Sequence, residues 1–393
     1  MKRKWWIVGG LVFLELLVCG GILLTLWAGR AVFEGVRLFY VADTHVEETV
    51  EETFFVDGPA VLELEAISGN VAVTGGEGDE VQVTARLSLW GSDEEDARRQ
   101  VDVWMAQDGN RITVRVVRPQ TIYAFASTRG SRVDFEIRVP HETALQLATS
   151  SGNLAVSDVA GSVELRTVSG SIRGEEVNGA VSARSSSGDV TLAGLSDGGD
   201  MEVRTVSGDV ALRDVAADSL VAHTSSGKIQ VAGGALSGEL DLEAISGRVT
   251  AEGVRAASYR LHSSSGDLTL DGCSGPLDLR TVSGEIEVRD GTEAELGIET
   301  SSGGVRFAGS LRARGNHRIK SVSGGVHLAL PADAAFDLDV ETVSGAIETD
   351  FAVTMTQFDR KHVAGEVNGG GPSLRINTSS GDVTLERATG END

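Results

Sequence analysis

The chain has 393 residues, with 49 glycines and only 6 prolines, and its formal net charge is −24. A surface this acidic repels phosphate backbones, which argues against a nucleic-acid partner. Two cysteines, Cys19 and Cys273, are too few for a disulfide framework.

The N-terminus consists of a basic tip followed by a long apolar segment. Lys2, Arg3 and Lys4 precede residues 5–27, which are almost continuously apolar. At 1.5 Å per residue, a helix of this length crosses a hydrocarbon core of about 30 Å. A cleavable signal peptide is the alternative, although its apolar core is normally about 7–15 residues. We expect a cytoplasmic tip and a retained single-pass membrane anchor over 1–29. The remainder is then extracytoplasmic, at the cell surface or in the periplasm.

Between the anchor and the C-terminus, the sequence divides into five parts. Residues 30–57 include four glutamates, at 47, 48, 51 and 52, and indicate a solvated juxtamembrane stalk. Residues 58–150 hold one copy of a repeat and then an insertion, in which periodicity predicts strands near 81–89, 112–117 and 133–139 and an amphipathic helix near 93–106. A regular repeat fills 151–347, an irregular insertion follows at 348–373, and 374–393 holds a last copy. We interpret both insertions as caps.

A Ser-Gly step marks the repeat and recurs thirteen times, mostly at intervals of 18 to 21 residues. Its glycines are Gly69, Gly152, Gly170, Gly188, Gly208, Gly227, Gly247, Gly266, Gly284, Gly303, Gly324, Gly345 and Gly381. Apolar residues lie seven and five positions before each glycine and two and four positions after it, with mostly polar residues between them. Period-two alternation predicts half-buried strands, so each unit is strand, Ser-Gly corner, strand and loop. We expect these glycines to be structural and to occupy left-handed corners.

Two further columns accompany the glycines. Three positions before the glycine, hydroxyl residues such as Thr167 and Thr205 can hydrogen-bond between rungs. The next position alternates between aliphatic residues and serine, as in Val168, Ser186 and Val206, which indicates a duplicated unit of two rungs.

The repeat determines the predicted fold. One unit of about 19 residues buries too little surface to offset its ordering entropy, whereas stacked units share one core. We therefore predict an all-β, single-chain parallel β-solenoid of about 13 rungs, preceded by one transmembrane helix. Rungs about 4.8 Å apart would form a rod of roughly 60 Å.

The motifs resemble those of a known family. Residues 62–71, Leu-Glu-Leu-Glu-Ala-Ile-Ser-Gly-Asn-Val, residues 133–140, Val-Asp-Phe-Glu-Ile-Arg-Val-Pro, and the repeated Thr-Val-Ser-Gly-Asp-Val turns are similar to the "putative adhesin" family of bacterial envelope β-solenoids. This domain of unknown function is also called the toast-rack domain, and the resemblance covers about 58–387. It implies a single-chain β-solenoid outside the cytoplasm. The family name suggests adhesion, and the family offers no catalytic residues to transfer to this sequence. Some relatives are linked to envelope-stress signalling.

Several residues could suggest a chemical site, but the repeat explains most of them. Ser196 lies in a Gly-x-Ser-x-Gly match, but that motif requires a strand-to-helix turn and no helix follows. Calcium needs six or more oxygen ligands, and basic residues interrupt the acidic column after the glycine. That column contains Asp189, Asp209, Asp267 and Asp382, with Lys228 and Arg248 between them.

Three other features are even weaker candidates for a chemical site. His223 and His262 share a column, but Glu243 separates them by a whole rung. Cys273 falls in an apolar column, which predicts a small buried residue. Asp359, Lys361 and His362 cluster outside the repeat, where a site would be easiest to overlook.

These features predict a binding protein and not an enzyme. We expect no catalytic, cofactor-binding or metal-binding residue and no cofactor. The favoured function is a membrane-anchored, adhesin-like binding or scaffold module of the cell envelope, including envelope sensing, with an envelope protein or glycan as partner. The alternative is a polysaccharide-acting β-helix enzyme, a lyase or glycosidase. Such an enzyme needs paired carboxylates and usually aromatic platforms, whereas Tyr259 and Phe307, both inward, are the only aromatic residues in 151–335.

Overall fold

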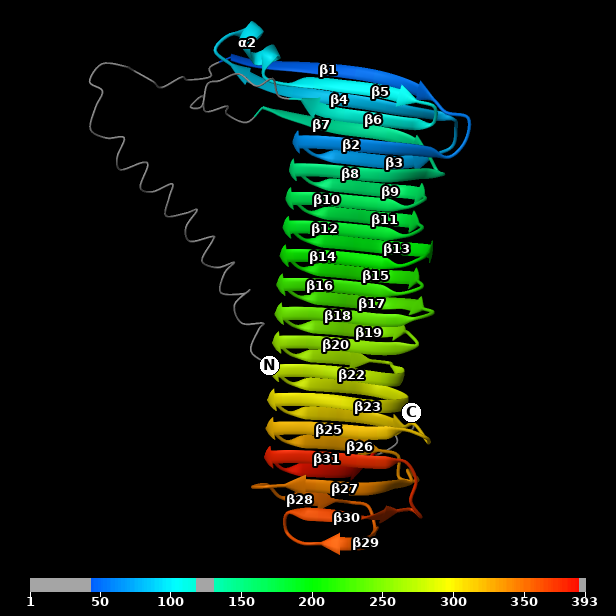
Figure 1. Cartoon of the computed structure of the whole chain (residues 1–393), viewed down its shortest axis with the longest axis vertical. Coiled ribbons are helices and arrows are strands. Elements are labelled where there is room, and N and C mark those ends of the chain that lie inside the picture. The colour runs from blue at the N-terminus through cyan, green and yellow to red at the C-terminus, as the bar shows by residue number, and fades with distance from the viewer. Residues whose placement is uncertain (1–43, 118–130, 389–393) are drawn as a thin grey trace, which may run out of the picture.

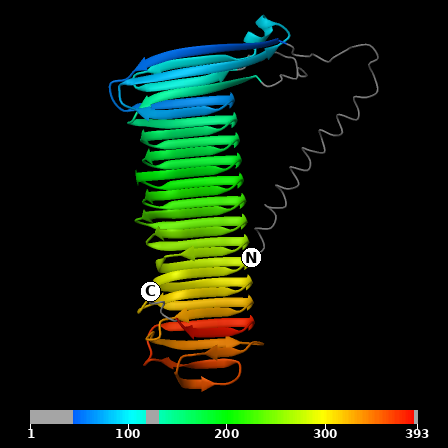
Figure 2. The ribbon, with the colours of Figure 1, turned by 180° about the vertical axis from the view of Figure 1, so that it is seen from behind.

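The computed structural model describes residues 44–117 and 131–388. They form a rod of stacked strands that is broader at its N-terminal end (Figures 1 and 2). Within these residues, α2 (Glu94–Arg99) is the one helix, and no helix is long and apolar enough to span a membrane. The anchor predicted over 1–29 lies outside the described residues.

Each unit of the repeat contributes one strand to each of two parallel sheets, as predicted. In stacking order the first sheet contains β2 (Ala60–Ser68), β8 (Thr143–Ser151), β10 (Val163–Ser169), β12 (Val181–Ser187), β14 (Met201–Ser207), β16 (Leu220–Ser226), β18 (Glu239–Ser246), β20 (Ser258–Ser265), β22 (Ser274–Ser283), β25 (Asn316–Ser323), β31 (Ser373–Ser380) and β27 (Phe336–Thr342). The second sheet contains β3 (Val71–Gly76), β9 (Leu154–Ala160), β11 (Ile172–Asn178), β13 (Val190–Gly198), β15 (Val210–Ala217), β17 (Ile229–Leu236), β19 (Val249–Arg255), β21 (Leu268–Asp271), β24 (Val305–Leu311), β26 (Val326–Leu330), β32 (Val383–Arg387) and β28 (Ile347–Thr349). The long β23 (Ile286–Ser302) bends from the second sheet into the first.

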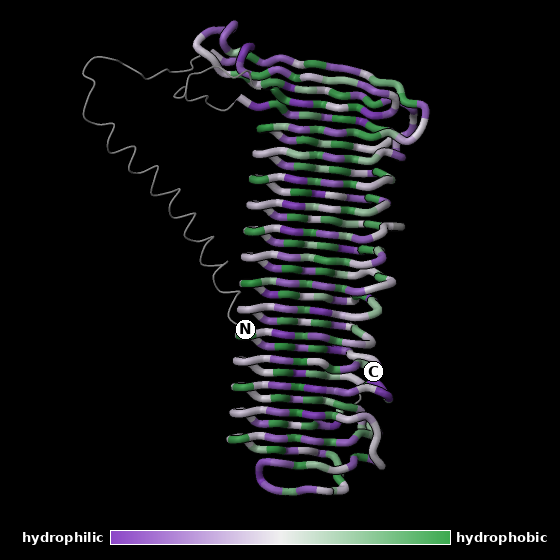
Figure 3. Tube along the Cα trace, viewed as in Figure 1, coloured by the Kyte–Doolittle hydropathy of each residue, from purple (hydrophilic) through white to green (hydrophobic). Residues whose placement is uncertain are grey.

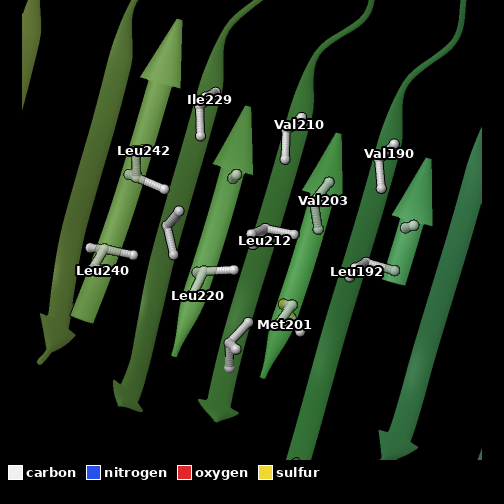
Figure 4. Packing of buried hydrophobic residues seen from close by; sticks show 14 of the residues in the cluster. Val190, Leu192, Met201, Val203, Val210, Leu212, Leu220, Ile229, Leu240 and Leu242 are labelled. Atoms are coloured by element: carbon white, nitrogen blue, oxygen red, sulfur yellow. The ribbon is translucent and has the colours of Figure 1, made fainter. Parts of the chain in front are cut away.

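The core lies between the two sheets. Leu220 and Leu240 of the first sheet and Leu212 and Ile229 of the second are completely buried, and they occupy the same layer (Figure 4). Hydropathy alternates along each strand (Figure 3), because successive side chains point to opposite faces of a sheet. The predicted apolar columns therefore form one continuous core.

The chain winds without interruption for about nine turns, so the predicted count of about 13 was too high. The thirteen Ser-Gly corners do stack, but their order in space differs from their order in sequence. Strand β31 pairs with β25 on one side and β27 on the other, and the corner at Gly381 lies between those at Gly324 and Gly345. The chain leaves a one-rung gap, forms the C-terminal cap and returns to fill that gap. Spacing alone counts repeat copies without showing which copies are neighbours.

Additional strands extend both sheets at the N-terminal end. Strands β6 (Arg111–Val117) and β7 (Arg132–Pro140) pair in parallel with β2 and β3. Strand β5 (Asp102–Asp108) adds to β6, β4 (Glu80–Gly91) adds to β7, and β1 (Thr44–Phe55) adds to β4, all antiparallel. This arrangement caps the first rung.

Two predictions in this region were wrong. The acidic part of the predicted stalk at 30–57 lies in β1, where Val46 is buried against the cap and the four glutamates are exposed. Charged residues on an edge strand discourage pairing with another chain. The helix predicted near 93–106 ends at Arg99, since α2 has only six residues and alternating burial places Val103 and Met105 in β5.

At the C-terminal end, β29 (Val353–Phe358) and β30 (His362–Val367) form an antiparallel hairpin. Strand β30 also pairs antiparallel with β27, so the hairpin covers the end of the first sheet. The irregular segment at 348–373 therefore contains two strands.

Seven of the thirteen corner glycines have the predicted positive φ, such as Gly69 (φ +121°), but all thirteen share a close backbone approach that was not predicted. Gly208 and Gly284 lie outside the left-handed region. A Cβ on either would lie 2.1 Å from the carbonyl oxygen of the corner glycine one rung earlier, far inside van der Waals contact. Residues with φ near +50 to +70° form a separate column six positions after the corner, with glycine at Gly253 (φ +63°) and aspartate at Asp214 (φ +51°).

Candidate functional site

Side chains complete the hydrogen bonding of the backbone at the Ser-Gly corners. Thr205 Oγ1 donates to the carbonyl oxygen of Gly188, one rung earlier, at 3.2 Å. The equivalent bonds are Thr167 to Gly152, Ser185 to Gly170, Thr224 to Gly208, Ser263 to Gly247, Thr281 to Gly266 and Thr342 to Gly381. The predicted hydroxyl column thus connects rungs through the glycine carbonyls, and not through contacts between hydroxyls.

The acidic column after the glycine also bonds to the backbone. The Asp209 N–H donates to Oδ1 of Asp189 at 2.9 Å, and Asp209, Asp267 and Asp382 accept the corresponding bonds at 2.8 to 3.1 Å. These carboxylates satisfy amides that the corner leaves without a backbone partner. Among the residues that the structure describes, no group of three or more His, Cys, Asp or Glu could hold a metal ion.

The structure does not assemble Ser196 into a nucleophile turn. Ser196 lies inside β13, and its hydroxyl donates to Oδ1 of Asn178 on the preceding rung. The next element is another strand, β14. The Gly-x-Ser-x-Gly match therefore occurs in a strand–turn–strand context.

His223 and His262 lie on β16 and β20, on the outer face of the first sheet, with β18 between them. His223 Nε2 is 3.7 Å from Glu243 Oε2, and His262 Nε2 is 3.5 Å from Asp278 Oδ2. Each imidazole contacts a carboxylate of the adjacent rung, so the two histidines do not form a joint site.

Cys273 is buried in the core, in the column predicted from the sequence. Burial raises the pKa of its thiol to about 12. Because the thiolate is the reactive form of cysteine, this residue is an inert apolar side chain at physiological pH.

The cluster in the C-terminal insertion stabilises the cap. Asp359 accepts from the backbone N–H groups of Lys361 and His362 at 2.6 and 3.0 Å and closes the β29–β30 turn. His362 contacts Asp339 of β27 at 3.0 Å, and Arg375 of β31 donates to Asp339 at 2.9 Å. Burial opposes ionisation of Asp339, but these two bonds outweigh it and lower the pKa of the carboxyl group. Asp339 thereby connects the hairpin to the inserted rung.

A groove of about 700 Å³ lies on the outer face of the first sheet, next to the corners. We name it the corner groove. One wall carries residues four positions before the glycine, and the other carries residues two positions before it. The first wall includes Arg166, Arg184, Arg204, His223 and Glu243, and the second includes Val168, Ser186, Val206, Ser225 and Ile245. The groove spans seven rungs, from Glu65 to Ile245.

Arginines on three consecutive rungs give the groove a basic centre in an otherwise acidic protein. Arg166 and Arg184 both pair with Glu164, the second at 3.9 Å. Arg184 and Arg204 both pair with Glu202, the second at 2.6 Å. Exposed ion pairs contribute only about 0–1 kcal/mol each to stability. Their main effect is to order the guanidinium groups along the groove wall.

Aliphatic residues two positions before the corner glycines, on the second wall and beyond it, are unusually exposed. Val168, Val206, Ile245, Val282 and Val322 are each 54–56% exposed, and serines occupy the rungs between them. We name this column, two positions before each corner glycine, the valine–serine ladder. Along one edge of the rod in Figure 3, hydrophobic corners (green) alternate with corners of intermediate hydropathy (near white).

A family model matches this architecture over residues 61–271, 198–313 and 238–386, and the family is Toastrack DUF4097. The chain belongs to the Toastrack DUF4097 family. No curated protein matches the Toastrack chain in sequence.

Three solved structures are distantly similar to this Toastrack chain. A putative cell adhesion protein from Clostridium sporogenes is 9% identical, with 86% of this chain and 100% of that chain covered and a TM-score of 0.18. A putative lipid binding protein from Parabacteroides distasonis is 16% identical, with 72% and 96% covered and a TM-score of 0.37. A putative adhesin from Bacteroides fragilis is 10% identical, with 86% and 97% covered and a TM-score of 0.29.

The Toastrack chain also contains a buried histidine, which was not predicted from the sequence. His317 occupies the apolar position seven residues before Gly324 and is 1% exposed. Its Nδ1 accepts from the Leu296 N–H at 3.3 Å, and its Nε2 lies 3.2 Å from the Arg312 carbonyl oxygen. Burial lowers the pKa of His317, and this pair of bonds fits the neutral ring. Its place in an apolar column was the available signal.

Proposed function

We propose that this Toastrack protein is a non-catalytic, adhesin-like binding or scaffold rod that holds an extended partner along its corner groove. One observation carries the proposal. The side chains that could suggest chemistry are engaged within or between rungs, whereas the corner groove is continuous over seven rungs. Its volume of about 700 Å³ is in the range of ligand sites, about 300–1,000 Å³. Its length suits a polymer or a protein surface better than a small molecule.

We further propose that residues 1–29 anchor the rod in the bacterial cell membrane and that the rod is extracytoplasmic. The basic tip Lys2–Lys4 and the apolar segment support this orientation. An envelope protein or glycan would then be the partner, and envelope sensing would be one use of the contact. Protease added to spheroplasts should degrade the rod. Protection under conditions that cleave an exported control protein would contradict the orientation.

Binding to isolated envelope preparations tests the role of the groove. We expect Arg166→Ser, Arg184→Ser and Arg204→Ser together to weaken binding by at least tenfold, because they remove the basic centre of the groove. The matched control replaces Arg173, Arg213 and Arg306, which are exposed on the outer face of the second sheet, and should change binding less than twofold. Equal losses in the two triple variants would contradict a groove-specific site.

The enzyme alternative requires a pair of carboxylates in the groove. The two acidic residues that line it, Glu65 and Glu243, lie at opposite ends, six rungs or roughly 29 Å apart. Glycosidase carboxylates lie about 5–9.5 Å apart. The protein should therefore turn over no polysaccharide, ester or peptide, and excess chelator should leave its melting temperature unchanged. Activity that disappears in Ser196→Ala or Asp267→Asn would favour the enzyme.

A further inference from the structure

The valine–serine ladder alternates in space over the whole rod. In stacking order it contains Ile67, Ser150, Val168, Ser186, Val206, Ser225, Ile245, Ser264, Val282, Ser301, Val322, Ser379 and Val343. Val343, at the C-terminal end, is 72% exposed. The alternation thus extends well beyond the corner groove.

The order of the rungs shows that this pattern belongs to the folded surface. In sequence, the corner of Val343 follows directly after that of Val322, so two aliphatic residues would be neighbours. Because β31 inserts between β25 and β27, Ser379 lies between them and the alternation is complete. A duplication of two-rung units explains alternation along the chain, but it does not explain alternation across a rung that is inserted out of order.

We propose that a second copy of this chain packs antiparallel along the valine–serine ladder, with the aliphatic residues of each copy in the serine positions of the other. The inference rests on the proposed function, because it names the partner that covers the groove wall. Aliphatic residues recur every second rung, roughly 9.6 Å apart, and each serine leaves room between two of them. A second copy carries the same spacing over the same length, so two antiparallel ladders offset by one rung keep aliphatic residues opposite serines along nearly the whole rod.

The size of the surface is sufficient for such a dimer. The thirteen stacked corners extend roughly 60 Å, and the strip that includes both groove walls is three residues, or roughly 10 Å, wide. About 600 Å² per copy, or about 1,200 Å² in total, would be buried, which is the lower limit for a specific interface. Interdigitation would also remove from water the exposed parts of the aliphatic side chains.

Charge favours the antiparallel orientation. Arg166, Arg184 and Arg204 flank the N-terminal half of the ladder on consecutive rungs. A parallel pair would place these three arginines beside their own copies, at a cost in electrostatic repulsion. In the C-terminal half the same column has no run of like charge. It contains Glu243, Glu299 and Glu341, with Arg280 and Lys320 between them. An antiparallel pair therefore brings the arginine block toward a mixed surface around Glu299 instead of toward a second arginine block.

Sedimentation equilibrium of the full chain in density-matched detergent tests the interdigitation. We expect a dimer that weakens at least tenfold in Val206→Ser/Ile245→Ser/Val282→Ser, which removes the aliphatic residues. The dimer should weaken as much in Ser186→Val/Ser225→Val/Ser264→Val, which fills the serine positions that receive the partner's aliphatic residues. The control Thr191→Val/Thr250→Val/Thr269→Val also replaces three hydroxyl groups by methyl groups, but on the outer face of the second sheet, and should change the dimer less than twofold. Tighter association of the gap-filled variant would show general hydrophobic adhesion and would overturn the proposal.

Cross-linking in a Cys19→Ser background tests the orientation. We expect Val168→Cys chains mixed with Val322→Cys chains to form disulfide-linked heterodimers, while Val168→Cys chains alone stay unlinked. Efficient cross-linking of Val168→Cys alone would overturn the antiparallel arrangement. A wild-type chain that stays monomeric but binds envelope preparations through the arginines would overturn self-association and leave the proposed function standing. A chain that does neither would contradict both.

Discussion

The two edges of the rod differ in regularity. At the Ser-Gly edge, strands of successive rungs keep one register, and each corner repeats the same glycine contact and nearly the same side-chain bonds. At the opposite loop edge, the register shifts between Leu195 and Gly198, between Ser274 and Gly275, and twice in β23. Differences in repeat length are therefore absorbed at the loop edge. The strict edge is the one that carries the corner groove and the valine–serine ladder, which require constant spacing.

An insertion should separate the two edges most strongly. Two residues added between Ser207 and Gly208 would displace a corner and break its hydrogen bonds to both adjacent rungs, at a cost of about 4 kcal/mol. The same two residues between Ala313 and Arg314 would enlarge an exposed turn, at a cost below about 1 kcal/mol. Chemical denaturation measures both values. Similar losses at the two sites would contradict the distinction between a strict and a permissive edge.

Glycine substitutions should show the next largest difference. Gly208→Ala would place a Cβ 2.1 Å from the Gly188 carbonyl oxygen, and such overpacking should cost about 2–3 kcal/mol. Gly253→Ala meets no atom within 4 Å, so only its left-handed backbone resists the change, at about 1 kcal/mol. The two free energies of unfolding should be compared directly. A larger loss for Gly253→Ala would restore the interpretation that backbone conformation selects the corner glycines.

The hydroxyl column offers an internal control. Thr205→Val removes the donor to Gly188 and leaves that carbonyl without this bond, which should cost about 1–2 kcal/mol. Thr300 occupies the same column and is buried, but its Oγ1 has no hydrogen-bond partner. Thr300→Val should therefore be within about 0.5 kcal/mol of wild type. Equal costs in urea unfolding would show that packing, and not the bond to glycine, selects threonine.

His317 should make the stability of the loop edge depend on pH. Its buried ring contacts the carbonyl oxygen of Arg312, in the exposed turn at 312–315. Burial lowers its pKa below the ordinary value of 6.5. Above pH 6.5 the ring is neutral in both states, and this contribution to stability is complete. Below pH 6.5 the unfolded state binds a proton that the folded state resists, so stability falls by at most about 1.4 kcal/mol per pH unit. His317→Leu should reduce this slope in pH-dependent melting, and an unchanged slope would assign it to other groups.

The sequence was sufficient for the strand columns because glycine marks each unit and burial alternates with period two. Leu212, for example, is buried in β15 four positions after Gly208, as predicted. The insertion of β31 could not be read from spacing, since a returning strand can pair with any open neighbour. The serine at 379 was a signal of its position, but only once the ladder was seen to alternate in space.

The corner groove was missed for a related reason. Each rung contributes one or two ordinary surface residues, such as Arg184 and Ser186, and the groove exists only after seven rungs are stacked. The glycine columns show a second limit. Sequence identifies where glycine is needed, but a close approach at Gly208 and a left-handed backbone at Gly253 look the same in one sequence.

The order of rungs at the Ser-Gly edge is the feature on which the ladder depends, and paired cysteines can measure it directly. Ser323 pairs with Ser380 on the adjacent strand, and neighbouring rungs lie about 4.8 Å apart, within reach of a disulfide. Ser323 and Ser344 are two rungs apart, roughly 9.6 Å, which is too far. Mass spectrometry of oxidised variants should find the disulfide in Ser323→Cys/Ser380→Cys and not in Ser323→Cys/Ser344→Cys. A disulfide in the second variant alone would mean that the rungs stack in sequence order, and it would contradict the alternating ladder.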